Sequence, residues 1–236
     1  MYLKYISKLK KFCNEKKYKL TKIWNQKNYS IFKIVINKNP EKTICITAGI
    51  HGDERSAPFG ILKFLFKYKP KNNDPKIIIF PLLNPYGFEK NKYENHKNID
   101  LNHHFLDKPL KSEIKLIYGS LKHEKISIFV AFHEDDEKKG LYLYNYSDNV
   151  NLFKNLIKFL SKKCKIYNDK KIYRNKSKKG IITNPKNDGS FEERMYKDGV
   201  HYSTCIEIPD YFSFSKRVNL VVDITKYLVN ILKLNK

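Results

Sequence analysis

The sequence has 236 residues, of which 41% are hydrophobic and 14% aromatic, a composition that excludes a disordered or fibrous chain. A chain of this length buries roughly 70% of the surface it exposes when unfolded, so we expect one domain with a substantial core. The net charge of +23 would suit a nucleic-acid partner, but the basic residues are almost all lysine and are dispersed along the chain. This dispersion argues against nucleic acid as the main partner.

The first 40 residues predict a helix and two strands at the edge of the domain. Leu3, Ile6 and Leu9 recur three residues apart, which is typical of an amphipathic helix over residues 2–14. Residues 19–24 and 29–36 then alternate in polarity as strands do.

Beyond residue 40, short apolar runs alternate with helical patterns. The runs at residues 43–48, 76–82 and 127–132 are rich in Ile and Val and predict buried strands. Helical spacing is found at residues 56–68, 110–122, 149–163 and 215–233. The alternation predicts a single α/β domain with a mixed, mostly parallel twisted sheet and helices on both faces. Residues 165–190, rich in lysine and asparagine, are interpreted as a long excursion or flap.

The cysteines and the N-terminus bear on cellular location. The four cysteines have no paired spacing and are interpreted as buried free thiols: Cys13, Cys45, Cys164 and Cys205. The N-terminal residues lack the apolar run of a signal peptide, and no segment approaches 18 apolar residues. We therefore expect a cytoplasmic protein without a membrane span, whose oligomeric state the sequence leaves open.

Polar residues follow two of the predicted buried strands at their carboxyl ends, where sheets of this kind bind ligands. His51 and Glu54 lie three residues apart on the turn after residues 43–48, and His133 ends the strand at residues 127–132. A catalytic zinc ion takes three such ligands and leaves a fourth position for water. The pattern predicts one zinc ion per chain at His51, Glu54 and His133, with the acids at 134–136 orienting the His133 imidazole. A lone histidine at a strand end more often fills only a hydrogen-bonding role, so the prediction depends on the three residues together.

Glu207 lies within the apolar run at residues 202–209, where burial penalises a carboxylate unless a partner or a function compensates. One interpretation is a buried ion pair, with Arg217 as the candidate partner. The other is a general base that takes a proton from water and delivers it to a leaving nitrogen.

Five motifs in order resemble the zinc carboxypeptidase superfamily, which includes the succinylglutamate desuccinylase and aspartoacylase group. They are GIHGDE at 49–54, NPYGF at 84–88, IDLNHHF at 99–105, FHEDD at 132–136 and CIEIP at 205–209. The resemblance spans residues 43–220. We expect a single domain over residues 1–236, with a helix and edge strands at 1–40 and the catalytic core at 41–236. The resemblance also implies that Glu207 is the catalytic glutamate and that Asn102 holds the substrate carboxylate. The NPYG turn would shape the cleft floor, although an ordinary Asn-Pro turn fits it equally well.

Two positions depart from the family's pattern. The arginine that usually follows the asparagine is His103 here, and the arginine that usually polarises the scissile carbonyl is Tyr93. Neither replacement is a permanently charged bidentate donor, so the substrate-binding half is altered while the hydrolytic half is intact. Arg55 and Arg194 are the candidates to replace the lost arginines.

The favoured prediction is a zinc-dependent, metallocarboxypeptidase-like hydrolase that cleaves a terminal amide bond of a small peptide. A deacylase of N-acyl amino acids on the same scaffold is the nearest alternative. The altered arginines also leave open a catalytically impaired binding protein.

Overall fold

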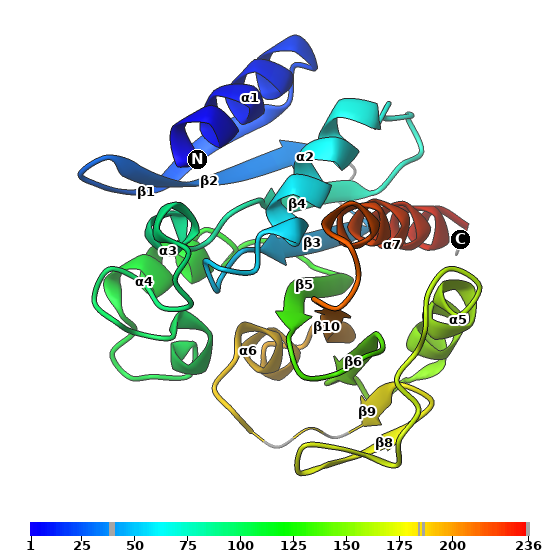
Figure 1. Cartoon of the computed structure of the whole chain (residues 1–236). Helices are drawn as coiled ribbons and strands as arrows, with labels where there is room; N and C mark the ends of the chain where they lie inside the picture. The colour runs from blue at the N-terminus through cyan, green and yellow to red at the C-terminus, as the bar shows by residue number, and fades with distance from the viewer. Residues whose placement is uncertain (38–40, 184, 186, 235–236) are drawn as a thin grey trace.

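A ten-stranded mixed sheet forms the centre of the protein in the computed structural model, which describes residues 1–37, 41–183, 185 and 187–234 (Figure 1). Its strands, in chain order, are β1 (Lys19–Gln26), β2 (Tyr29–Ile36), β3 (Thr43–Ala48), β4 (Lys76–Phe80), β5 (Ile128–Asp135), β6 (Tyr142–Asn145), β7 (Lys171–Ile172), β8 (Asn175–Lys178), β9 (Ile181–Thr183) and β10 (Tyr202–Pro209). They lie in the order β1-β2-β4-β3-β5-β10-β6-β9-β8-β7.

The central strands β4, β3, β5 and β10 are parallel to one another, and β6 is parallel to β9. The other pairings are antiparallel. The predicted mixed α/β sheet is confirmed, but its parallel character belongs mainly to the centre. Because those central strands are buried on both faces, they read as continuous apolar runs in the sequence.

Helices cover both faces of the sheet (Figure 1). One face is covered by α1 (Tyr2–Glu15), α2 (Ser56–Lys67), α5 (Asn151–Leu160) and α7 (Phe214–Leu234). The other carries α4 (Ser112–Gly119), α6 (Phe191–Lys197) and the 3₁₀ helix η1 (Leu101–His104), whereas α3 (Pro85–Lys90) packs its Phe88 against Tyr5 of α1 and Phe59 of α2. Within the described ranges, no helix has both the length and the apolar character needed to cross a membrane.

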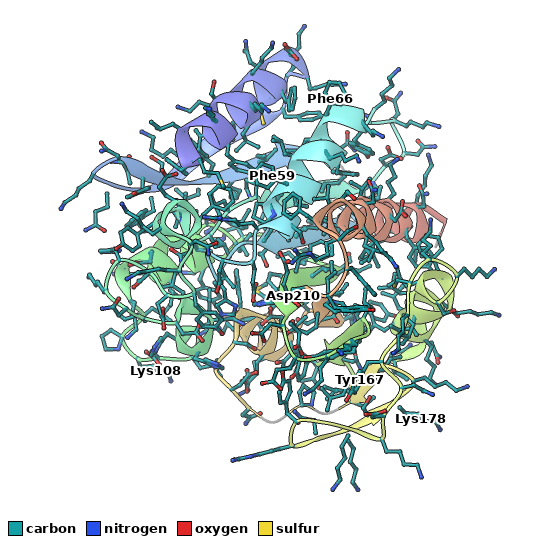
Figure 2. All side chains as sticks on the ribbon, in the orientation of Figure 1. Phe59, Phe66, Lys108, Tyr167, Lys178 and Asp210 are labelled. Atoms are coloured by element: carbon teal, nitrogen blue, oxygen red, sulfur yellow. The ribbon has the colours of Figure 1, made fainter. Side chains whose placement is uncertain are left out.

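Side chains fill the space between the sheet and both helical layers (Figure 2). Alternation along each strand divides them between the two faces. Ile46, Val130 and Ile206 belong to the core under α2 and α7, whereas Phe129 packs with Phe191 of α6 at a ring distance of 4.7 Å. On this second face His133 of β5 and Glu207 of β10 lie opposite each other in the ladder.

Element boundaries differ from the predicted ones at several ends. The predicted strand at 127–132 continues to Asp135, because residues 133–135 still pair with β10. The helices predicted at 110–122 and 149–163 are shorter, ending in hydrogen-bonded turns beyond Gly119 and Leu160. The excursion predicted at 165–190 is in part ordinary sheet, since β7, β8 and β9 lie within it; residues 184 and 186 lie outside the described residues.

Candidate metal centre

The turn that carries His51 and Glu54 packs directly on the NPYG turn. Gly49, at the end of β3, has a φ of +62°, a conformation that favours glycine. A Cβ on Gly52 would lie 2.0 Å from the carbonyl carbon of Gly87, so the two backbones can approach only because residue 52 has no side chain. Asn84 supports this contact by accepting a hydrogen bond from the Gly87 amide at 2.9 Å. The NPYG segment is therefore the base on which the ligand turn is held.

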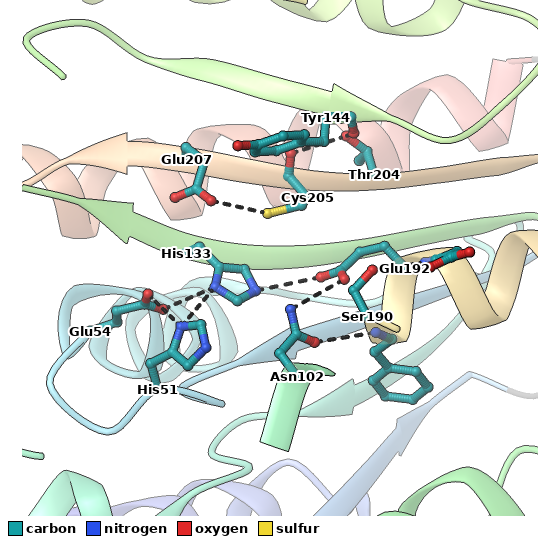
Figure 3. Close-up of polar contacts among 12 residues, drawn as sticks. His51, Glu54, Asn102, His133, Tyr144, Ser190, Glu192, Thr204, Cys205 and Glu207 are labelled. Atoms are coloured by element: carbon teal, nitrogen blue, oxygen red, sulfur yellow. Dashed lines mark hydrogen bonds and ion pairs between the residues drawn. The ribbon is translucent and has the colours of Figure 1, made fainter. Parts of the chain in front are cut away.

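Three donor groups predicted from the sequence converge at one point beyond the carboxyl ends of β3 and β5 (Figure 3). The Nδ1 atoms of His51 and His133 are 3.2 Å apart, and Glu54 Oε2 lies 3.3 Å from His133 Nδ1. Glu54 Oε1 is 2.7 Å from His51 Nδ1. All three residues are buried.

These residues fit a zinc ion by the spacing and chemistry of their donors. Tetrahedral bonds of 2.0–2.2 Å put neighbouring ligand atoms about 3.3 Å apart, close to the separations of His133 Nδ1 from the other two groups. Glu54 Oε2 is buried without a hydrogen-bond partner among the described residues. Two imidazoles and one carboxylate are also the donor set of many catalytic zinc sites.

Each histidine presents its other ring nitrogen to a carboxylate. His51 Nε2 lies 3.1 Å from Asp100 Oδ1, and His133 Nε2 lies 3.4 Å from Glu192 Oε1. Glu192 is fully buried, and Asp100 also accepts hydrogen bonds from the Asn102 amide and the Tyr93 hydroxyl. Neither acid was among the predicted site residues, although Asp100 lies inside the IDLNHHF motif.

The acids at 134–136 do not orient His133, contrary to the prediction. Glu134 points to the opposite face of the sheet, where it accepts hydrogen bonds from the Ser56 amide and from Arg217. Asp135 accepts from the hydroxyls of Tyr142 and Tyr173. Alternation along β5 explains the result for Glu134, because adjacent residues of a strand point to opposite faces. Asp135 is on the same face as His133 but is engaged by the two tyrosine hydroxyls.

Electrostatic shifts in the metal centre follow from the close packing of charges. Burial opposes a charge on His51, but Glu54 and Asp100 outweigh it and raise the pKa of His51 to about 9. Burial likewise disfavours ionised Glu54, but both histidines lower the pKa of this carboxyl to about 2. Protonated imidazole thus offsets the negative charge of the carboxylates. A divalent cation bound at the same place would take over this role, and its binding would release the imidazole protons.

Glu207 lies next to the three ligands, on the adjacent strand β10. Its backbone is held on both sides, by His133 of β5 and Tyr142 of β6. Burial raises the pKa of Glu207 to about 7, against the lowering effect of His133. Arg217 pairs with Glu134, so the predicted ion pair between Glu207 and Arg217 is absent. A partly exposed carboxyl with a pKa near neutrality has the properties of a general base.

The three predicted substrate-binding residues lie around the same centre. The Tyr93 ring stacks on His51 with centroids 3.7 Å apart, and its hydroxyl donates to Asp100. Asn102 is buried, accepts from the Phe191 amide at 3.2 Å and donates to Glu192 at 3.5 Å. His103 is exposed, with Nδ1 2.7 Å from the Asp188 carbonyl oxygen. Both the oxygen and the nitrogen of the Asn102 side-chain amide thus already have protein partners.

The arginines considered as replacements are engaged elsewhere. Arg55 donates to the Phe88 carbonyl, and Arg194 donates to Asp198, the Phe105 carbonyl and the Tyr118 hydroxyl. Arg194 is thus bound through all three of its nitrogens, whereas Arg55 is bound through Nη2 and its Nε is buried without a hydrogen-bond partner among the described residues.

Comparison with known proteins agrees with this geometry. Residues 40–153 match the model of the succinylglutamate desuccinylase/aspartoacylase catalytic domain, a segment that contains all three candidate ligands but not Glu207. No curated protein sequence matches the chain.

Solved structures share the fold over nearly the whole chain. A protein of Shewanella denitrificans described as a metallopeptidase superposes with a TM-score of 0.87 at 22% identity, covering 96% of this chain and 88% of its own. A metallo-carboxypeptidase from Burkholderia cenocepacia superposes with a TM-score of 0.74 at 12% identity, covering 95% and 67%. A metallo-carboxypeptidase from Pseudomonas aeruginosa gives 0.68 at 13% identity, covering 94% and 68%. The predicted resemblance is thereby confirmed: the fold is shared with metallo-carboxypeptidases across nearly the whole chain, and residues 40–153 match the succinylglutamate desuccinylase/aspartoacylase model.

Proposed function

We propose that the protein is a zinc-dependent hydrolase of amide bonds, with one zinc ion held by His51, Glu54 and His133. The observation that carries the proposal is the convergence of two imidazole Nδ1 atoms and a carboxylate beside Glu207. When bound, a zinc ion supplies a Lewis acid for the scissile carbonyl and lowers the pKa of the attacking water toward about 7.

Glu207 has the position and the proton affinity for both proton transfers of such a reaction. As a carboxylate it takes a proton from water while the water oxygen bonds to the carbonyl carbon. It then gives that proton to the nitrogen as the carbon–nitrogen bond breaks, which returns Glu207 to its ionised form. The Cys205 thiol donates to Glu207 Oε1 at 3.4 Å and steadies the ionised state.

For the substrate we propose a terminal amide bond of a small peptide, as in a metallocarboxypeptidase. The match of residues 40–153 to the desuccinylase/aspartoacylase model favours a second candidate, the removal of an acyl group from an N-acyl amino acid. Both substrates present an amide next to a carboxylate, so they demand the same hydrolytic groups.

Metal analysis tests the proposal first. Purified protein prepared with excess zinc should hold one zinc ion per chain, and His133→Ala should lose it, because two remaining ligands hold zinc weakly. His104→Ala is the matched control: His104 contacts Asp107 outside the centre, so its loss should leave zinc content unchanged. Zinc absent from the wild type, or retained equally by His133→Ala, would contradict the assignment.

Hydrolysis assays then separate the candidates. Short peptides with free C-termini should be cleaved by a carboxypeptidase, and N-acetyl or N-succinyl amino acids by a deacylase. Zinc bound without hydrolysis of either class would instead favour a binding protein on the same fold.

A further inference from the structure

Glu192 is a fully buried carboxylate that neither the ligand set nor the proton transfers use. Within the described residues its oxygens face two side chains. Oε1 lies 3.4 Å from His133 Nε2, and Oε2 accepts from Asn102 Nδ2 at 3.5 Å (Figure 3). Burying a carboxylate costs free energy unless such partners compensate its charge, which indicates that Glu192 has a role at this position.

The same arrangement recurs on the other histidine. His51 turns Nδ1 to the centre and forms a hydrogen bond through Nε2 with Asp100. His133 likewise turns Nδ1 to the centre and Nε2 toward Glu192, an ion-pair contact of 3.4 Å in which neither atom has a hydrogen-bond partner among the described residues. A carboxylate at Nε2 keeps the ring proton there, which leaves the Nδ1 lone pair for a metal ion and fixes the ring's orientation.

We propose that Glu192 is the positioning residue of His133, and that Asn102 holds Glu192 in place and so supports the metal centre. Asn102 is fixed for this task, because its Oδ1 accepts from the amide of Phe191, the residue next to Glu192. The Ser203 hydroxyl donates to the Glu192 carbonyl at 2.7 Å and ties the same residue to β10.

A second metal ion at His133, Glu192 and Cys205 is the rival interpretation, since their donor atoms lie within 4.8 Å of one another. Two points argue against it. The Cys205 thiol already donates a hydrogen bond to Glu207, and the single imidazole of His133 would have to bind two cations.

The proposal rests on the zinc centre proposed above, so its test measures zinc affinity by competition with a chromophoric chelator, without substrate. Glu192→Met keeps the volume and removes the acceptor, and it should weaken zinc binding about 10- to 100-fold. Glu192→Gln keeps a neutral acceptor, and its zinc affinity should lie between that of the wild type and that of Glu192→Met. Glu193→Met is the matched control, because Glu193 is buried on the same helix but contacts Lys197 and the amides of 188–189.

A double-mutant cycle tests the part assigned to Asn102. Asn102→Ala should weaken zinc binding in the wild type and have little further effect in Glu192→Met, because it acts through Glu192. Circular dichroism confirms that each variant is folded, and Asn102→Ala tests the same chain of contacts if Glu192→Met does not fold.

The outcomes are distinct. Wild type without zinc affinity would overturn the proposed function itself. Zinc bound tightly by the wild type and equally by Glu192→Met would overturn only the role of Glu192. Two equivalents of Co²⁺, with a thiolate absorption band lost in Cys205→Ser, would also overturn it, because Glu192 would then be a ligand of a second ion.

Discussion

The backbone of Glu207 is paired on both sides, and Glu207→Gln keeps the size of the side chain while removing its charge. We expect Glu207→Gln to keep its zinc and its fold and to lower kcat at least about 10²-fold, the lower range for a positioned general base. Turnover and zinc content of the same preparation measure this. A purely structural Glu207 would give the reverse result, a lower Tm with the activity of the folded fraction unchanged.

His103 stays the predicted reader of a substrate carboxylate, being exposed beside the centre with Nε2 3.4 Å from Asp100 Oδ2. Arginine forms a bidentate, permanently charged contact that histidine cannot reproduce. We therefore expect His103→Arg to lower KM for a substrate with a free carboxylate and His103→Ala to raise it, with little change in kcat. The corresponding substrate amide, which lacks the charge, is the control. Equal KM values for all three proteins would exclude His103 from recognition.

At the scale of elements, Asp74 joins three segments. It accepts from the Tyr68 hydroxyl after α2 at 2.7 Å and from the Lys71 amide, and it pairs with Lys233 of α7 at 3.2 Å. Burial opposes its charge, but these hydrogen bonds outweigh burial and lower the pKa of Asp74.

We expect Asp74→Asn to lower the free energy of unfolding at pH 7 by about 1–3 kcal/mol, the usual cost of breaking hydrogen bonds to a buried charge. Because the folded-state pKa is the lower one, this stabilisation is complete above the unfolded pKa of about 3.9 and is lost as pH falls further. Urea unfolding from neutral to acid pH should show the two proteins converging. Asp223→Asn breaks an exposed ion pair with Lys163 and should change little; an equal loss there would contradict the argument.

The sequence predicts best those helices and strands whose ends are marked by neighbouring residues. The strands at 43–48 and 29–36 have the predicted bounds, because their apolar runs stop abruptly at charge, Gly or Asn. The short helix α6 was missed although Ser190 and Glu193 mark its start, where the Ser190 hydroxyl accepts from the Glu193 amide.

The candidate site divides in the same way. His51 and Glu54 share one turn, and His133 lies near the carboxyl end of β5, so their convergence followed from sheet geometry. Glu192 could not be predicted in this way, because it lies on a helix, 59 residues after His133 in the chain. No local sequence pattern encodes their contact.

At the scale of the whole molecule, the charge of the centre opposes that of the protein. The net charge is +23, whereas Glu54, Asp100, Glu192 and Glu207 gather at one point. At long range, the positive electrostatic field of the protein should attract anionic molecules. At short range, the four carboxylates favour a cation in the centre.

This division predicts a salt effect on substrate capture. KM for a doubly negative N-acyl amino acid should rise between about 0.01 and 0.15 M salt, as the screening length falls from about 30 to 8 Å. A neutral amide substrate is the control and should show no such rise. Salt-independent KM for the anionic substrate would mean that the dispersed lysines do not steer it.

The far edge of the sheet has a different consequence. The hairpin of β7 and β8 is separated from the strands of His133 and Glu207 by β6 and β9, yet Tyr173 at its turn donates to Asp135 beside the centre. Edge hairpins tolerate insertions and deletions far better than central ladders do. Changes of length within residues 171–178 should therefore leave the strand pairing of His133 with Glu207 in place, while altering the contact that Tyr173 makes beside the centre.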